Sequence, residues 1–497
     1  MNVISQLREH FVEITRLKYI KALLDWDQQV CMPNGSVKGR SEQMALIEGI
    51  IHEKLVSKKT GDLVKNAEKI SDLNFIDSAM LREAKREYEK EVKLPNELVV
   101  DIAKTASLGH QAWENAREKS DFLIFQPLLD KMIKLQKKKA EKLDIYPSRY
   151  STLIDQYEPG ATHEWISKIF KVLKVKLINI IDKINSSENE PDQSILIKNY
   201  DKEKQWAFSL EVLRKMNFDF NTGRQDKSAH PFSTSVSSMD TRITTRVFEN
   251  YLPTCLFGTI HECGHALYEM GFMDEIRDTI LADGSSFGIH ESQSRLWENI
   301  VGRSREFWTY WYPVLQKYFP ENLNEYPEEE FYRSINCVQP SLIRVEADEV
   351  TYGLHIILRF ELEKEIIEND LDTSELPSIW NHKMKTLLGI APPDDASGVL
   401  QDIHWSSGDF GYFPTYTLGN LYASQIYASA LKKLPFLSED FEKGDFSNLL
   451  AFLRKNLHQY GKIYRPLDLL KKITGEELNP DYFVNYLEKK FYLVYGI

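Results

Sequence analysis

In Gly258-Thr-Ile-His-Glu-Cys-Gly-His-Ala-Leu-Tyr268, two histidines lie four residues apart. On a helix this spacing places the imidazoles of His261 and His265 on one face, where both can reach a single ion. Glu262 is displaced by about 100° of helical rotation, so its carboxylate is expected beside the ion. There it can take a proton from an attacking water and return it to a leaving amine. The stretch therefore predicts a catalytic metal site, for which zinc is the default ion.

Two small residues lie between the histidines. A glycine inside a helix costs about 1 kcal/mol relative to alanine, so Gly264 predicts the close approach of another backbone at this point. Cys263 points some 200° away from His261. We therefore expect Cys263 to be a packed thiol and not a ligand.

A third ligand is expected downstream, in the segment 288–299, where helical spacing begins at about Glu291. The 25 residues between His265 and Glu291 are enough for a loop that brings a second helix against the first. Glu291 is therefore the preferred ligand. Three other acidic residues compete for this role: Glu275, Asp283 and Glu298. His290 either lines a cleft or forms packing and helix-entry contacts.

Most of the remaining chain has helical periodicity. An amphipathic helix near the start ends by the turn at 32–35. Further helices are predicted near 40–58, 76–93, 97–118, 124–143, 163–185, 202–216, 328–338, 341–367, 373–388, 417–433, 446–460 and 480–491. Only 232–247, which is rich in Ser, Thr and Val, predicts short strands or a hairpin. Without repeats or long linkers, the sequence predicts one mainly α domain over 1–497, with the metal-site segment at 232–300.

Composition excludes several classes of protein. The 497 residues are 42% hydrophobic and 27% charged, which is typical of a globular chain and not of a disordered or collagen-like one. No uncharged apolar run approaches the ~20 residues needed to cross a bilayer. The net charge of -12 repels phosphate, so nucleic acid is not an expected partner.

The expected compartment is the cytoplasm. The first 18 residues carry scattered charges and do not resemble a secretory signal. The four cysteines are few and widely spaced, as in a reduced cytosolic enzyme.

Five motifs together resemble those of the carboxypeptidase Taq family of metallocarboxypeptidases. In the family's order along the chain, they are Asp240-Thr-Arg-Ile-Thr, His261-Glu-Cys-Gly-His265, His290-Glu-Ser-Gln-Ser294, Ile343-Arg-Val-Glu-Ala-Asp348 and Gly398-Val-Leu-Gln-Asp-Ile-His-Trp405. The resemblance implies zinc or cobalt held by His261, His265 and Glu291, with Glu262 as base. It also implies a homodimer of mostly helical, two-lobed subunits around a deep groove. The short strands predicted over 232–247 place a small β-sheet beside the zinc-binding helix.

Recognition of a free peptide C-terminus requires a group that binds a carboxylate. A guanidinium does so through two parallel charge-assisted hydrogen bonds. By resemblance Arg344 takes this role, and Arg242 is a second candidate. Arg344 and Asp348 also have i,i+4 spacing, so a plain salt bridge is the alternative reading. Asp240 is expected to orient neighbouring groups.

Peptide hydrolysis also needs hydrogen-bond donors for the developing oxyanion. Related helical zinc peptidases use a histidine and a tyrosine, and by resemblance these are His404 and Tyr416. Tyr412 is an alternative to Tyr416. Gly408 and Gly411 suggest a mobile loop that could bring either tyrosine inward.

One position departs from a related pattern. Some helical zinc peptidases place an acidic residue one turn after the glutamate ligand to orient a histidine ligand, but Arg295 stands there in this chain. Glu298 and Asp283 are the nearest alternatives. His230, just ahead of the predicted strands, is expected to pack against them, and a place near the floor of a cleft is the alternative.

The sequence thus predicts a cytoplasmic metallocarboxypeptidase that releases single amino acids from the free C-termini of peptides with broad specificity. An endo-acting oligopeptidase with the same metal site is the first alternative. A non-catalytic peptide-binding protein with a structural metal is the second. Glu262 argues against the second, because a structural site needs no base beside an open coordination position.

Overall fold

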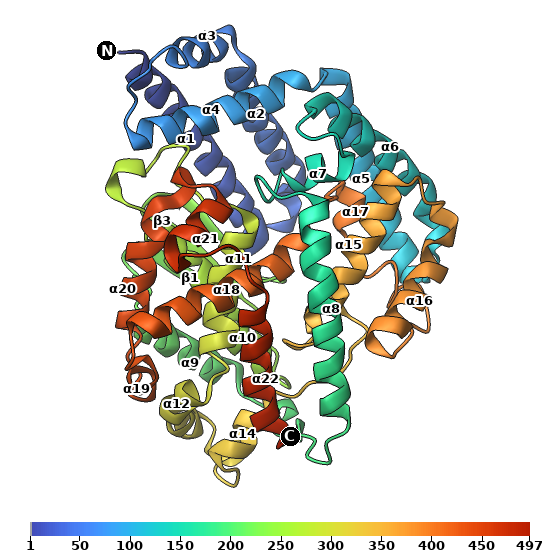
Figure 1. The fold of residues 1–497 in the computed structure, drawn as a ribbon, viewed down its shortest axis with the longest axis vertical. Helices are drawn as coiled ribbons and strands as arrows, with labels where there is room; N and C mark the ends of the chain where they lie inside the picture. Colours follow the sequence, from blue (N-terminus) through green and yellow to red (C-terminus); the bar gives the residue numbers. More distant parts are fainter. Residues whose placement is uncertain (1) are drawn as a thin grey trace. The chain divides into compact units, whose positions relative to one another are not determined.

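The computed structural model describes residues 2–497. The chain forms two compact units, each assembled from three separate stretches of sequence. Unit 1 comprises Met1–Val92, Asp192–Ile335 and Tyr422–Leu478, and unit 2 comprises Lys93–Pro191, Asn336–Leu421 and Asn479–Ile497. Both units are mainly helical, as predicted, and Figure 1 shows their helices and strands.

Unit 1 holds the sheet and the helices around it. Its helices are α1 (Val3–Val30), α2 (Val37–Val56), α3 (Lys58–Ala67), α4 (Phe75–Lys93), α9 (Lys202–Lys215), α10 (Leu252–Glu269), α11 (Phe287–Arg295), α12 (Arg305–Tyr318), α13 (Pro320–Leu323), α14 (Glu328–Ser334), α19 (Leu437–Glu442), α20 (Ser447–Asn456) and α21 (Pro466–Thr474). A π-helical segment, Leu296–Val301, continues α11.

The sheet has three strands in the order β1-β3-β2. The predicted hairpin is confirmed: β2 (Ser233–Ser237) pairs antiparallel with β3 (Asp240–Thr245). Strand β1 (Gly223–Lys227) pairs parallel with β3, with Gly223 opposite Thr241. Sequence reasoning missed β1 because only Gln225 of its five residues is buried, so the strand has no apolar alternation.

Helix α10 packs against β3, α9 and α11. Pro253 lies in its first turn, where a missing N–H costs nothing. Buried residues occur on every side of the helix, from Leu252 to Tyr268. A helix that is buried on every side lies in a core. This packing holds α10 in place and so fixes where His261 and His265 point.

Unit 2 is built around α15 (Tyr352–Glu368), which packs against α7, α8 and α16. The other helices of unit 2 are α5 (Asn96–Lys119), α6 (Gln126–Leu143), α7 (Arg149–Ile154), α8 (His163–Asn185), α16 (Leu376–Leu388), α17 (His404–Ser407) and α22 (Asp481–Tyr495). The boundary between the units falls within α18 (Pro414–Lys433). The long helix α8 buries one apolar stripe, and Thr162 caps its N-terminus by accepting the Trp165 N–H.

The predicted helix over 341–367 is wrong in its first eleven residues, because α15 begins only at Tyr352. The Asp348 carboxylate accepts the backbone N–H groups of Gln339, Val350 and Thr351, which holds this stretch in a turn. The prediction also missed the helices α3, α7, α12, α13, α17, α19 and α21. In α12 an internal proline, Pro313, and a high aromatic content hide the helical pattern.

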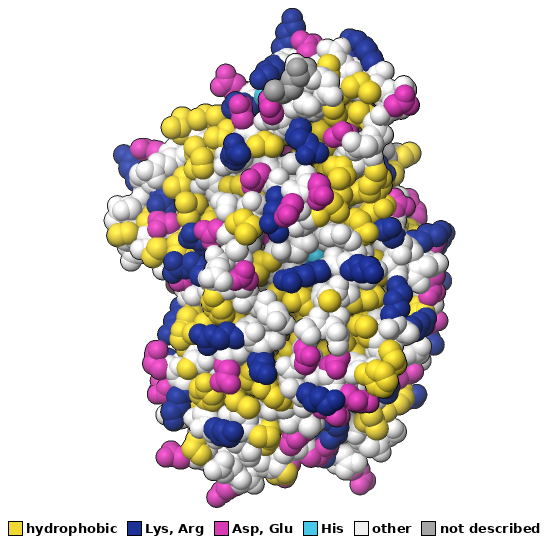
Figure 2. All heavy atoms as spheres, turned by 90° about the vertical axis from the view of Figure 1, so that its left-hand side faces the viewer, with side chains coloured by type: hydrophobic (Ala, Val, Ile, Leu, Met, Phe, Trp, Pro, Cys, Tyr) yellow, Lys and Arg dark blue, Asp and Glu magenta, His cyan; other side chains and the backbone are white. Residues whose placement is uncertain are grey.

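Two further findings concern the helices and the surface. In residues 2–497 no helix combines the length and the apolar character needed to span a bilayer. Figure 2 shows Lys and Arg side chains interspersed with Asp and Glu side chains over the face that it draws.

Candidate metal centre

The structure brings the three predicted ligands together in unit 1. His261 and His265 lie on α10, and Glu291 lies on α11, whose N-terminus is capped by Ser286. Glu291 Oε2 is 3.9 Å from His261 Nε2 and 3.6 Å from His265 Nε2. Ligand atoms about 2.0–2.1 Å from a tetrahedral ion lie roughly 3.4 Å apart. The spacing and the donor set therefore fit a zinc-type ion.

Gly264 explains how α11 reaches this position. A Cβ at Gly264 would lie 2.6 Å from the Gln293 carbonyl oxygen and 2.7 Å from Ser294 Cα. Both atoms belong to the backbone of α11, so the close approach predicted from the sequence is present. The missing side chain allows the two helices to bring Glu291 up to the histidines.

His261 is oriented by Glu298, one of the two acidic residues that the sequence offered for this role. The ring Nδ1 lies 2.8 Å from Glu298 Oε2, which leaves Nε2 for the ion. Asp283, the other alternative, instead pairs with Lys462 at 2.5 Å. Arg295 donates through Nε to Glu291 Oε1 at 2.7 Å and also contacts Glu298. It thus holds the ligand carboxylate and the orienting carboxylate together.

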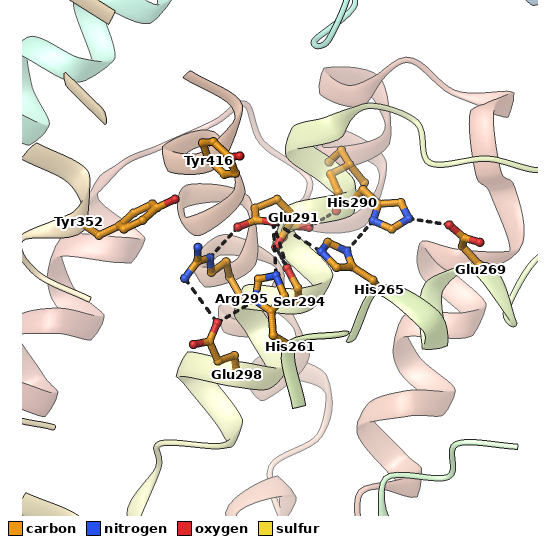
Figure 3. A network of polar contacts seen from close by, with 12 residues as sticks. His261, His265, Glu269, His290, Glu291, Ser294, Arg295, Glu298, Tyr352 and Tyr416 are labelled. Carbon is orange, nitrogen blue, oxygen red and sulfur yellow. Dashed lines mark hydrogen bonds and ion pairs between the residues drawn. The ribbon is translucent and has the colours of Figure 1, made fainter. Parts of the chain in front are cut away.

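His265 is oriented through a different chain of contacts, shown in Figure 3. Its Nδ1 lies 2.5 Å from His290 Nδ1, and His290 Nε2 lies 3.1 Å from Glu269 Oε1. The other Glu269 oxygen accepts a hydrogen bond from Ser235 on β2. Sequence reasoning missed Glu269. Its signal was present, because Glu269 follows His265 by four residues and so shares its helix face.

Burial and neighbouring charges shift the pKa values of two carboxyl groups in the site in opposite directions. Burial raises the pKa of Glu262 to about 7, with Glu291 and Glu298 adding to the rise and His261 opposing it. Burial acts in the same direction on Glu298, but Arg295 and His261 lower its pKa to about 2. Glu262 can therefore exchange a proton near neutrality, whereas Glu298 stays ionised.

Cys263 is fully buried, as expected for a packed thiol, and burial raises its pKa.

In unit 2, Arg344 is paired with Asp402. Arg344 Nε lies 3.0 Å from Asp402 Oδ1, and Nη1 donates to the Tyr352 hydroxyl at 3.1 Å. Arg359 occupies the other carboxylate oxygen, with Nε 2.7 Å from Asp402 Oδ2. The alternative prediction of a salt bridge between Arg344 and Asp348 is wrong. Arg344 pairs with Asp402, and the Asp348 carboxylate accepts backbone N–H groups in the turn ahead of α15. Asp402 and Arg359 were missed, although Asp402 stands in the quoted motif at 398–405.

This cluster is buried and carries a surplus positive charge. Two guanidiniums share one carboxylate, so one positive charge remains. Burial lowers the pKa of His404 to about 4 and that of His355 to about 3, so both rings are neutral at pH 7. A buried surplus charge is costly unless a ligand or water compensates it.

The predicted oxyanion donors also lie together in unit 2. His404 Nε2 is 3.3 Å from the Tyr416 hydroxyl, and the His404 ring packs on Phe413 at 4.5 Å. Tyr412, the alternative, packs its ring edge-on against Tyr157 at 5.1 Å. Tyr416 is therefore the tyrosine that contacts His404 through its hydroxyl.

Arg242 lies on β3 in unit 1. Its Nε and Nη2 bind the two Asp240 oxygens at 3.0 and 2.8 Å, so Asp240 orients it as expected. The guanidinium lies 4.2 Å from the Trp26 ring centroid. His230 is exposed, so its expected packing against the strands is wrong.

Comparison with known proteins identifies the family of the chain. A model of the carboxypeptidase Taq (M32) metallopeptidases matches residues 6–491. The chain belongs to this family. It is 39% identical over 499 residues to carboxypeptidase 1 of Bacillus subtilis (strain 168), with 100% of both chains covered. It is 40% identical over 504 residues to thermostable carboxypeptidase 1 of Thermus thermophilus, with 99% of each covered.

A solved structure has the same fold. The crystal structure of the M32 carboxypeptidase from Deinococcus radiodurans R1 matches with a TM-score of 0.98 at 37% identity, and 100% of each chain is covered. The enzyme is therefore a metallocarboxypeptidase with a metal cofactor and peptide substrates.

Proposed function

We propose that this enzyme releases single amino acids from the free C-termini of peptides, with broad specificity, and that its ion is zinc, with cobalt as a possible substitute. The observation that carries C-terminal recognition is the pair of buried guanidiniums, Arg344 and Arg359, that share the single carboxylate of Asp402. A peptide's terminal carboxylate supplies the missing negative charge.

His261, His265 and Glu291 would hold the ion. When bound, the ion supplies Lewis acidity that polarises the scissile carbonyl and makes water acidic. Glu262 accepts the proton of the attacking water. The same carboxyl group can then return the proton to the leaving amine.

Arg344 binds the terminal carboxylate through the N–H groups that Asp402 and Tyr352 do not occupy. Asp402 fixes the guanidinium plane, and Tyr352 fixes one edge of it. Arg242 provides an additional contact through its remaining N–H groups. Endo-acting cleavage would have no need of this charge arrangement.

His404 and Tyr416 donate hydrogen bonds to the oxyanion. The pKa of His404 is lowered to about 4 by burial, so its ring is neutral and has one N–H to donate at pH 7. A neutral donor stabilises a developing negative charge and takes no part in the preceding proton transfer.

We also propose a cytoplasmic homodimer. Cys31, Cys255, Cys263 and Cys337 are all free, which is typical of a reducing compartment. The dimer rests on the family resemblance.

Mass spectrometry of a digested peptide, with its C-terminus either free or amidated, tests the proposal. The free peptide should lose residues one at a time, and the amidated peptide should be cleaved at least about 100-fold more slowly, because a bidentate charged contact is lost. Equal cleavage of both peptides, or internal cuts, would instead indicate the endo-acting alternative.

A further inference from the structure

The proposed mechanism leaves one fully buried carboxylate unused. Glu363 lies on α15, and none of its surface is exposed. Its Oε2 accepts hydrogen bonds from the Tyr150 hydroxyl at 2.8 Å and the Gly411 N–H at 2.9 Å. Its Oε1 accepts one from Trp405 Nε1 at 2.9 Å. Buried carboxylates usually bind a cation, but here, within residues 2–497, neutral donors surround the group.

Two of these donors lie in the segment that joins His404 to Tyr416. Trp405 directly follows His404, and Gly411 directly precedes Tyr412. The indole of Trp405 stacks on Phe410 with the two rings 3° from parallel. One carboxylate thus holds the segment at two points.

The path of this segment is one that only glycine allows at Gly411. Its φ is +91°, and a Cβ would lie 2.7 Å from the Ile154 backbone nitrogen. In this conformation the Gly411 N–H points at Glu363. Three residues later α18 begins at Pro414, so the loop geometry sets where the first turn of α18 places Tyr416.

We propose that Glu363 is a positioning residue, which fixes the loop 405–413 so that His404 and Tyr416 are held together for catalysis. The inference rests on the oxyanion role proposed above for these two residues. It explains why a carboxyl group occupies this buried place, since its ionised form, which prevails above about pH 7, offers four acceptor sites and no donor to three converging N–H and O–H groups.

An amide would not serve. Glu363→Gln keeps the size of the side chain but turns one oxygen into a donor. That donor would face either the Trp405 N–H or the pair formed by Tyr150 and Gly411, and the corresponding contact would be lost. The loop would then no longer be fixed at both points.

The test compares Glu363→Gln with Glu361→Gln. Glu361 lies two residues earlier on α15 and makes only partly exposed ion pairs with Lys174 and Lys383. We expect kcat on a free-ended peptide to fall about 100-fold in Glu363→Gln, because a misplacement near 1 Å has such an effect. KM, zinc content and far-UV circular dichroism should stay close to wild type. Glu361→Gln should keep wild-type kcat. A Glu363→Gln enzyme with wild-type kcat would overturn the proposal.

A double-mutant cycle with Tyr416→Phe separates positioning from general stability. If Glu363 acts through the pair, Glu363→Gln should reduce kcat less than about threefold in the Tyr416→Phe background. Multiplicative losses would overturn the proposal. Wild-type kcat in Tyr416→Phe alone would instead overturn the oxyanion role, so the two failures are distinguishable.

If Glu363→Gln does not fold, Trp405→Phe removes one donor and keeps an aromatic ring. We expect its kcat to fall about tenfold with zinc content unchanged, since one of the two loop contacts is lost. A folded Trp405→Phe enzyme with wild-type kcat would overturn the proposal as well.

Discussion

The two histidines of the metal site present the same ring nitrogen to the ion because their other nitrogens are held by neighbouring side chains. Both ligand histidines use Nδ1 for an orienting contact, with Glu298 in one case and His290 in the other, and both leave Nε2 toward Glu291. The ligand spacing could be predicted from sequence, because it follows from helix geometry alone. The orienting partners could not be chosen, since that choice depends on which helix packs against α10.

Glu262→Gln tests the base. The amide cannot accept the proton of the attacking water, so we expect kcat to fall about 10³- to 10⁴-fold. Zinc content, measured by elemental analysis, should be retained, because Glu262 is not a ligand. Glu275→Gln, at an exposed position in unit 1, is the control and should keep wild-type kcat. A Glu262→Gln enzyme with full activity would contradict the mechanism.

Asp402→Asn tests the charge arrangement in unit 2. The change leaves Arg344 less firmly held and leaves the fully buried Arg359 without its carboxylate. We expect KM for free-ended peptides to rise about 10- to 100-fold, and the melting temperature to fall because breaking a buried ion pair costs about 3–5 kcal/mol. Asp394→Asn changes an exposed aspartate that binds Ser397 and serves as the control. Unchanged KM in Asp402→Asn would argue against carboxylate recognition by this cluster.

At the scale of elements, the metal site depends on the contact between α10 and α11. Gly264 indicated that contact from the sequence. The hairpin of β2 and β3 could also be predicted, because these strands carry a local pattern of Ser, Thr and Val. Strand β1 and the start of α15 could not be predicted, because β1 is set by pairing with β3 and the stretch before α15 is held by the side chain of Asp348.

Gly264→Ala tests the helix contact. The new Cβ would meet backbone atoms of α11 within 2.6–2.7 Å, so α11 must move and take Glu291 with it. We expect the dissociation constant for zinc, measured by competition with a chelator, to rise about 10- to 100-fold. Gly49→Ala on α2 is the matched control. A Cβ there would meet nothing within 4 Å, so this change should leave zinc affinity unchanged and stabilise the helix by up to about 1 kcal/mol. Equal zinc affinity in both variants would contradict the account.

At the scale of the whole molecule, the residues to which we assign roles belong to two different units. The metal ligands and Glu262 belong to unit 1, and Arg344, His404 and Tyr416 belong to unit 2. The mainly α class and most helices could be predicted from periodicity. Periodicity does not predict the division, which only the family resemblance implied as two lobes, because each unit combines three stretches that are far apart in sequence, and such long-range contacts leave no local pattern.

Stability should respond to pH through Glu363. Burial raises its pKa to about 7, from an ordinary value of 4.5. A group whose pKa is raised on folding adds stability at low pH, and this contribution is lost as pH rises toward the folded-state value. The free energy of unfolding of wild type relative to Glu363→Gln should therefore fall by up to about 1.4 kcal/mol per pH unit between pH 4.5 and 7 and should level off above pH 7. Differential scanning calorimetry across this range measures the effect, and a pH-independent difference would contradict it.

Anomalous X-ray scattering at the zinc absorption edge, from crystals grown with zinc, tests the metal centre most directly. We predict one strong peak in each chain, about 2.0–2.1 Å from His261 Nε2, His265 Nε2 and an oxygen of Glu291. A peak bound by other residues, or no peak between these three side chains, would contradict the central claim.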